Sequence, residues 1–122
     1  MSVEQDGVKQ IKEAELKELL GESNKERVFI DVREVEEYDE FHIPGVPLIP
    51  MNTIPNHVQD LNKDKEYVLI CRSGGRSQNV ALYLKEQGFD KVANFNGGML
   101  SWTGETKEGQ EWVVEKAEEL YK

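Results

Sequence analysis

Cysteine is almost absent from this chain, since Cys71 is the only one among 122 residues. A single cysteine excludes an internal disulfide and any metal site built from several cysteines. Neither histidine has a second potential ligand nearby in sequence, so no metal site is predicted. If Cys71 begins sulfur or oxidation chemistry, a thiol from another molecule must complete it.

Long apolar runs and an excess of basic charge are also missing. The longest apolar runs, 28–30 and 68–71, are too short to cross a bilayer, and the first dozen residues lack the apolar core of a signal peptide. We therefore expect a cytoplasmic protein with no membrane partner. Lysine and arginine number 15 against 24 acidic residues, and the formal net charge of −9 argues against nucleic acid as a partner.

The spacing of apolar residues alternates between helical and strand patterns. It predicts helices over 8–20, 34–41, 53–61 and 77–87, and strands over 28–32, 48–49, 67–71 and 91–95. This alternation is typical of an α/β fold, with a central, mainly parallel sheet and helices on both faces. At 122 residues the chain fits one domain, 1–122. Its core is expected over about 8–104, and the polar tail 105–122 is predicted to be helical and to pack back on the domain.

Cys71 lies where a thiol is readily made into a nucleophile. The predicted strand 67–71 ends at it, and a polar, glycine-rich turn leads from there into the next predicted helix. A strand, a tight loop and a helix N-terminus in succession direct backbone N–H groups and the positive end of the helix dipole at one point. Arg72 and Arg76 add positive charge, and either could bind an anion. We therefore predict that Cys71 reacts as a thiolate with a small anionic substrate.

The remaining loop residues also have chemical uses. Gly74 and Gly75 let the loop adopt positive φ and turn successive amides inward. Ser73 and Ser77 can donate hydrogen bonds to sulfur or to oxygens of a substrate. Ser77 could instead cap the following helix, and both interpretations stay open.

Five segments of the chain, in the same order, resemble the rhodanese-like domain in its single-domain form. They are Asp31-Val32-Arg33 with Glu37-Tyr38, His42-Ile43-Pro44-Gly45, the loop Cys71-Arg72-Ser73-Gly74-Gly75-Arg76-Ser77, Gly88-Phe89 with Val92, and Gly97-Gly98-Met99-Leu100-Ser101-Trp102. Two residues depart from the family pattern away from the loop. Phe41 stands where the family usually has glycine, and Val46 replaces the usual alanine.

The resemblance implies a sulfurtransferase without a cofactor. The Cys71 thiolate would take the sulfane sulfur from a small anionic donor such as thiosulfate and hold it as a persulfide. An external acceptor, either cyanide or a thiol of a small molecule or a thioredoxin-like protein, would then remove it. The active-site loop would be formed by Arg72, Ser73, Gly74, Gly75, Arg76 and Ser77.

Three alternatives accompany this interpretation. The chain could be a non-catalytic interaction or regulatory module on the same scaffold, or a persulfide carrier serving one protein partner. It could also be a cysteine-dependent phosphatase or arsenate reductase, but those enzymes place five residues between cysteine and arginine, and only four separate Cys71 from Arg76. Outside the loop, we expect structural roles: Asp31 bracing a neighbouring loop, Arg33 paired with Glu36 or Glu37, and His42 bracing a turn.

Overall fold

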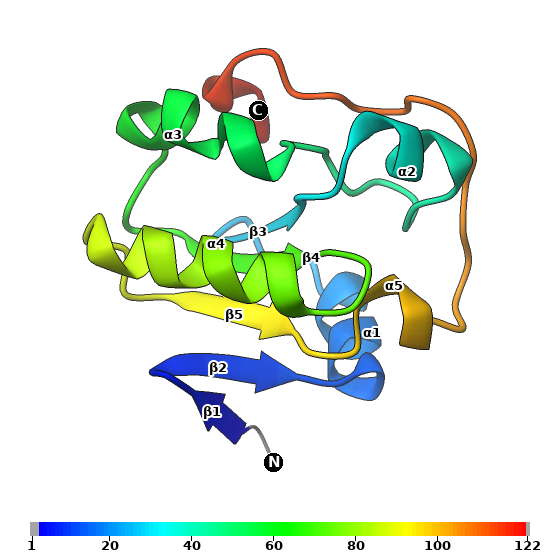
Figure 1. Ribbon diagram of the computed structural model, residues 1–122, viewed down its shortest axis with the longest axis horizontal. Coiled ribbons are helices and arrows are strands. Elements are labelled where there is room, and N and C mark those ends of the chain that lie inside the picture. The colour runs from blue at the N-terminus through cyan, green and yellow to red at the C-terminus, as the bar shows by residue number, and fades with distance from the viewer. Residues whose placement is uncertain (1–2, 122) are drawn as a thin grey trace.

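Five strands form one sheet in the order β1-β2-β5-β4-β3 (Figure 1). The computed structural model describes residues 3–121. The strands are β1 (Val3–Gln5), β2 (Val8–Ile11), β3 (Arg27–Asp31), β4 (Glu66–Ile70) and β5 (Val92–Phe95). The α-helices are α1 (Glu13–Gly21), α2 (Val35–Glu40), α3 (Ile54–His57), α4 (Gly75–Glu86) and α5 (Gly98–Ser101). Short 3-10 helices cover η1 (Met51–Thr53), η2 (Val58–Asp60) and η3 (Ala117–Tyr121).

The sheet is mainly parallel, as the sequence predicts. Strands β2, β5, β4 and β3 pair in parallel, and only β1 is antiparallel to its neighbour β2. The carboxyl ends of the parallel strands therefore lie along one edge of the sheet, where ligands bind in open α/β folds. None of the helices within residues 3–121 is long and apolar enough to cross a bilayer.

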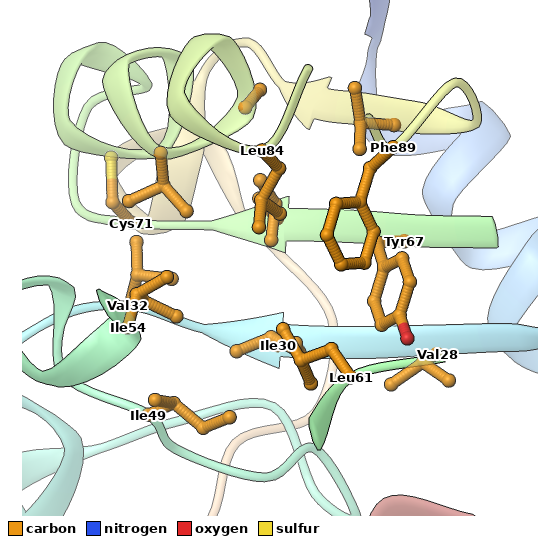
Figure 2. Close-up of a cluster of buried hydrophobic side chains, with 14 of the residues drawn as sticks. Val28, Ile30, Val32, Ile49, Ile54, Leu61, Tyr67, Cys71, Leu84 and Phe89 are labelled. Carbon is orange, nitrogen blue, oxygen red and sulfur yellow. The ribbon is translucent and has the colours of Figure 1, made fainter. Parts of the chain in front are cut away.

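Helices cover both faces of the sheet because the buried strands present apolar side chains on both sides. Along β4 the side chains alternate: Tyr67 and Leu69 join a cluster that contains residues of α3 and α4, whereas Val68 joins one with residues of α1 and α5. Figure 2 shows the first cluster, with Cys71 at its edge beyond the end of β4. The predicted α/β fold is confirmed.

The predicted helix over 8–20 is wrong in its first part. Residues Val8–Ile11 form strand β2, and α1 begins only at Glu13. Val8 and Ile11 are both fully buried, and their spacing fits one face of a helix as well as a short buried strand. Pairing of β2 with the distant strand β5 decides between the two.

Two further elements are smaller than their sequence pattern suggests. The segment predicted as one helix over 53–61 is divided into α3 and the 3-10 turn η2. The predicted strand 48–49 reduces to single bridges from Leu48 to Asp31 and to Val113.

Within its described residues, 105–121, the tail packs back on the domain but is not the predicted helix, and position 122 lies outside the described residues. It follows an extended path, the orange and red ribbon of Figure 1, and only Ala117–Tyr121 forms a 3-10 turn. The backbone of Leu48 accepts a hydrogen bond from Val114 at 3.0 Å and donates one to Trp112 at 2.9 Å. These pairings hold the chain extended, and they override the helical spacing of its apolar side chains.

Candidate active site

Cys71 immediately follows β4, and its sulfur lies under the first turn of α4 (Figure 2). The sulfur accepts a hydrogen bond from the backbone N–H of Gly74 at 3.0 Å and lies 3.2 Å from the Ser77 hydroxyl oxygen. The cysteine is 0% exposed. Contact with a substrate therefore requires displacement of the groups that cover it.

The turn after Cys71 requires glycine at one of its two glycine positions. Gly74 has φ of 96°, and a Cβ atom there would lie 2.0 Å from the carbonyl oxygen of Asn96. Gly75 begins helix α4, and a Cβ atom there would meet nothing within 4 Å. The prediction that both glycines adopt special conformations is therefore correct for Gly74 and wrong for Gly75.

Helix α5 holds the same loop from the other side. The N–H groups of Met99 and Leu100 donate to the carbonyl oxygens of Cys71 at 2.8 Å and Arg72 at 2.9 Å. A Cβ atom on Gly98 would lie 2.4 Å from the Arg72 carbonyl oxygen. The closing Gly97-Gly98 motif thus lets the chain approach the loop closely enough to fix its backbone.

Ser77 contacts the sulfur rather than capping the helix. It lies inside α4, which begins two residues earlier, so the interpretation as a cap is wrong. Its hydroxyl faces both the Cys71 sulfur and the side-chain oxygen of Asn94 on β5. Ser73, by contrast, is exposed on the loop.

Of the two loop arginines, Arg76 is half-buried against α2 and Arg72 is exposed. The Arg76 guanidinium donates to both carboxylate oxygens of Glu37 on α2, at 2.7 and 2.8 Å. Hydrogen bonding from Arg76, opposed by desolvation and helped by the Glu34 backbone N–H, lowers the pKa of Glu37 to about 2. Arg72 has no ion pair with any residue in 3–121. Sequence reasoning missed Glu37 as a site neighbour, although it belongs to one of the family segments.

The lowered pKa of Glu37 predicts a pH-dependent contribution to stability. A carboxyl with a depressed folded-state pKa stabilises the fold above its unfolded value, near 4.5, and this contribution is lost as pH falls toward about 2. We expect Glu37→Gln to destabilise the protein at pH 6 and much less at pH 3, as measured by urea unfolding. Glu40→Gln, at an exposed position of the same helix, is the matched control. An equal deficit for Glu37→Gln at both pH values would contradict the assignment.

Asp31 and Arg33 form a buried ion pair instead of the predicted pairing of Arg33 with Glu36 or Glu37. The Arg33 guanidinium donates to Asp31 at 2.8 Å, and both side chains are 2% exposed. The same guanidinium reaches the carbonyl oxygen of Phe41 at 2.8 Å. This pair joins the end of β3 to the end of α2, in agreement with the expected structural role of Asp31.

His42 braces its turn as expected. Its ring nitrogens lie 2.9 Å from the carbonyl oxygen of Tyr38 and 3.0 Å from the carboxylate of Glu111 in the tail. Glu111 also accepts the N–H of Gly45 at 3.0 Å, and this bond, followed by the contact with His42, lowers the pKa of Glu111. No cluster of three metal-ligating side chains occurs among residues 3–121.

Comparison with known proteins identifies the family. A family model described as the rhodanese-like domain matches residues 12–105. A Bacillus subtilis protein named "Putative sulfurtransferase YtwF" is 54% identical over 100 residues, which are 82% of this chain and 95% of that protein. A Pseudoalteromonas translucida protein named "Thiosulfate sulfurtransferase GlpE" is 36% identical over 95 residues, which are 77% of this chain and 88% of that one.

A solved structure agrees with the fold. The crystal structure of a rhodanese-like domain protein from Staphylococcus aureus superposes with a TM-score of 0.71 at 40% identity, covering 79% of this chain and 92% of that one. The family-model match includes strand β4, the Cys71 loop and helix α4, since all three lie inside residues 12–105. The chain therefore belongs to the rhodanese-like domain family.

Proposed function

We propose that the chain is a sulfurtransferase that carries sulfane sulfur as a persulfide on Cys71. The observation that supports this most directly is the local environment of the Cys71 sulfur. The Gly74 N–H group, the Ser77 hydroxyl and the N-terminus of α4 all face one sulfur atom. Hydrogen-bond donors and the positive end of a helix dipole stabilise an anionic sulfur.

The reaction then proceeds in two displacements. The Cys71 thiolate attacks the outer sulfur of thiosulfate, the S–S bond of the donor breaks, and sulfite departs with the electron pair. A new S–S bond leaves Cys71 as an anionic persulfide. In the second step an acceptor thiolate, or cyanide, attacks the outer sulfur and releases Cys71 as thiolate. The acceptor gains a persulfide, or becomes thiocyanate, and the charges balance in both steps.

The acceptor must come from another molecule because the chain contains no second cysteine. Small thiols or a thioredoxin-like protein would serve. Such acceptors are kept reduced in the cytoplasm, and we place the protein there. The bidentate pairing of Arg76 with Glu37 argues against the phosphatase alternative, in which the arginine at the end of the loop must itself be free to bind phosphate.

Intact-protein mass spectrometry tests the proposal. Brief exposure to thiosulfate without reductant should add one sulfur atom at Cys71, and cyanide or a thiol should then remove it. A reduced protein that gains no sulfur from thiosulfate or from polysulfide would contradict the proposal. It would direct attention to the interaction-module alternative. Slow turnover with small acceptors, after normal loading, would favour a carrier that serves one protein partner.

Arg72 is the arginine that we assign to donor binding. Its charge is exposed at the loop, whereas the charge of Arg76 is paired with Glu37. Charge-assisted hydrogen bonds are worth about 1.5–3 kcal/mol, so Arg72→Ala should raise the thiosulfate KM about tenfold or more. Arg76→Ala serves as the matched comparison. It should raise the thiosulfate KM less than Arg72→Ala does, and its main effect should be to destabilise the loop by removing the pair with Glu37. A KM that rises only in Arg76→Ala would reverse the assignment.

A further inference from the structure

The hydroxyl group of Ser77 has one proton and faces two acceptors. The Cys71 sulfur lies 3.2 Å away on one side, and the Asn94 side-chain oxygen lies within hydrogen-bond distance on the other. Ser77 is 0% exposed and Asn94 is 2% exposed. The proton can be donated to only one of the two acceptors at a time.

Asn94 is held so that its oxygen, and not its nitrogen, faces Ser77. Its amide nitrogen lies 3.1 Å from the carbonyl oxygen of Gly74, 2.9 Å from the side-chain oxygen of Gln10 and 3.2 Å from that of Gln78. Both glutamines are themselves oriented by backbone carbonyls. The nitrogen of Gln10 donates to Val8, and that of Gln78 donates to Gln5. Turning the Asn94 amide over would place its oxygen against three oxygens.

We infer that Asn94 is a positioning residue whose oxygen competes with the Cys71 sulfur for the Ser77 proton. This competition favours the thiol and the persulfide over the free thiolate. In the thiol state the S–H group can donate to the Ser77 oxygen while Ser77 donates to Asn94, so every partner is satisfied. In the thiolate state the Ser77 proton turns to the sulfur, and the oxygens of Ser77 and Asn94 face each other without a proton between them.

The persulfide removes this conflict. Its inner sulfur is bonded to the outer one and carries no net charge, so the Ser77 proton can stay with Asn94. The inference rests on the proposed function for this part, because the persulfide forms on Cys71 only if the chain takes up sulfane sulfur. Asn94 would then raise the driving force for the step in which the Cys71 thiolate takes up sulfur.

Charged groups near Cys71 do not produce this effect. Arg76 interacts electrostatically with Cys71, but its charge is paired with Glu37. Arg72 is exposed in the loop. At the end of β3, the buried side chains of Asp31 and Arg33 neutralise each other. The competition at Ser77 is therefore a separate influence, carried by neutral side chains.

A double-mutant cycle tests the inference through the pH profile of Cys71 alkylation by iodoacetamide. Asn94→Ala should move the midpoint of the profile down by about half a unit to one unit, a threefold to tenfold lower proton affinity. In the Ser77→Ala background the same substitution should leave the midpoint unchanged, because the shared proton is gone. An unchanged or higher midpoint in Asn94→Ala, or an equal shift in both backgrounds, would overturn the inference.

A second measurement uses unsubstituted Asn94, in case Asn94→Ala does not fold. The side-chain carbonyl carbon of Asn94, followed by NMR, should titrate with the same midpoint as alkylation, and the amplitude should fall sharply in Ser77→Ala. A flat profile in the unsubstituted protein would overturn the inference. Neither measurement needs sulfur transfer. If neither thiosulfate nor polysulfide loads Cys71 while the cycle shows the coupling, the proposed function is wrong and the competition for the proton stands.

Discussion

Replacing Cys71 with serine is expected to abolish sulfur transfer, with a fall in kcat/KM on the order of a thousandfold or more. A serine hydroxyl is not ionised near neutral pH and forms no persulfide, so neither displacement can begin. The fold should persist, since a hydroxyl oxygen can still accept the N–H of Gly74. Thiocyanate formation from thiosulfate and cyanide measures the activity, and circular dichroism with urea unfolding checks the fold.

The companion variant Cys71→Ala separates chemistry from hydrogen bonding. It removes both the nucleophile and the acceptor of the Gly74 and Ser77 donors. We expect it to be as inactive as Cys71→Ser. If either variant kept most of the activity while folded, the persulfide mechanism would have to be abandoned. Sulfur bound elsewhere in the chain could not explain such activity, because no other cysteine exists.

Gly74→Ala should be the most damaging substitution in the loop outside Cys71. Its Cβ atom would lie 2.0 Å from the carbonyl oxygen of Asn96, on a residue with φ of 96°. A left-handed conformation costs a non-glycine residue about 1–3 kcal/mol, and the clash with backbone adds to that cost. We expect a loss of about 3 kcal/mol or more in the free energy of unfolding, together with a large loss of sulfur loading.

Gly75→Ala is the matched control for this substitution. A Cβ atom at Gly75 meets nothing within 4 Å, and the residue is already helical. Alanine favours the helix over glycine by up to about 1 kcal/mol, so the protein should be as stable as before or slightly more stable. Urea unfolding of the two variants side by side decides the matter. Equal effects would mean that flexibility across the whole loop matters, rather than the geometry at Gly74.

The parts of the site that depend on neighbouring residues could be predicted from the sequence. Strand β4, the turn at Cys71 and helix α4 follow one another directly, and their local pattern predicts a nucleophile beside a helix N-terminus. The comparisons confirm the family and the fold that the ordered motifs imply. Assignment of Cys71 and the loop residues to catalysis and donor binding stays a prediction for the experiments above.

Most of what sequence reasoning missed depends on contacts between distant segments. Glu37 and Arg76 are 39 positions apart, and nothing in either local pattern indicates that they pair. The local pattern of β2 fits a helix as well as a strand, and its partner β5, which decides between them, lies more than eighty residues away. The Asp31–Arg33 pair is local: Arg33 pairs with the nearby carboxylate of Asp31 and not with the carboxylates expected on α2. In the first two cases a tertiary contact selected one of several arrangements that the local sequence allows.

The hairpin of β1 and β2 has a practical consequence for where this domain can be cut or fused. The family match begins at residue 12, yet β2 pairs along β5 and its Gln10 contacts Asn94. A fragment trimmed to 12–105 would leave the edge of β5 unpaired, which invites strand-to-strand aggregation. It would also lose Val114, a buried residue of the tail. Fusion partners and affinity tags should therefore be attached outside both flanking segments, with 3–121 kept whole.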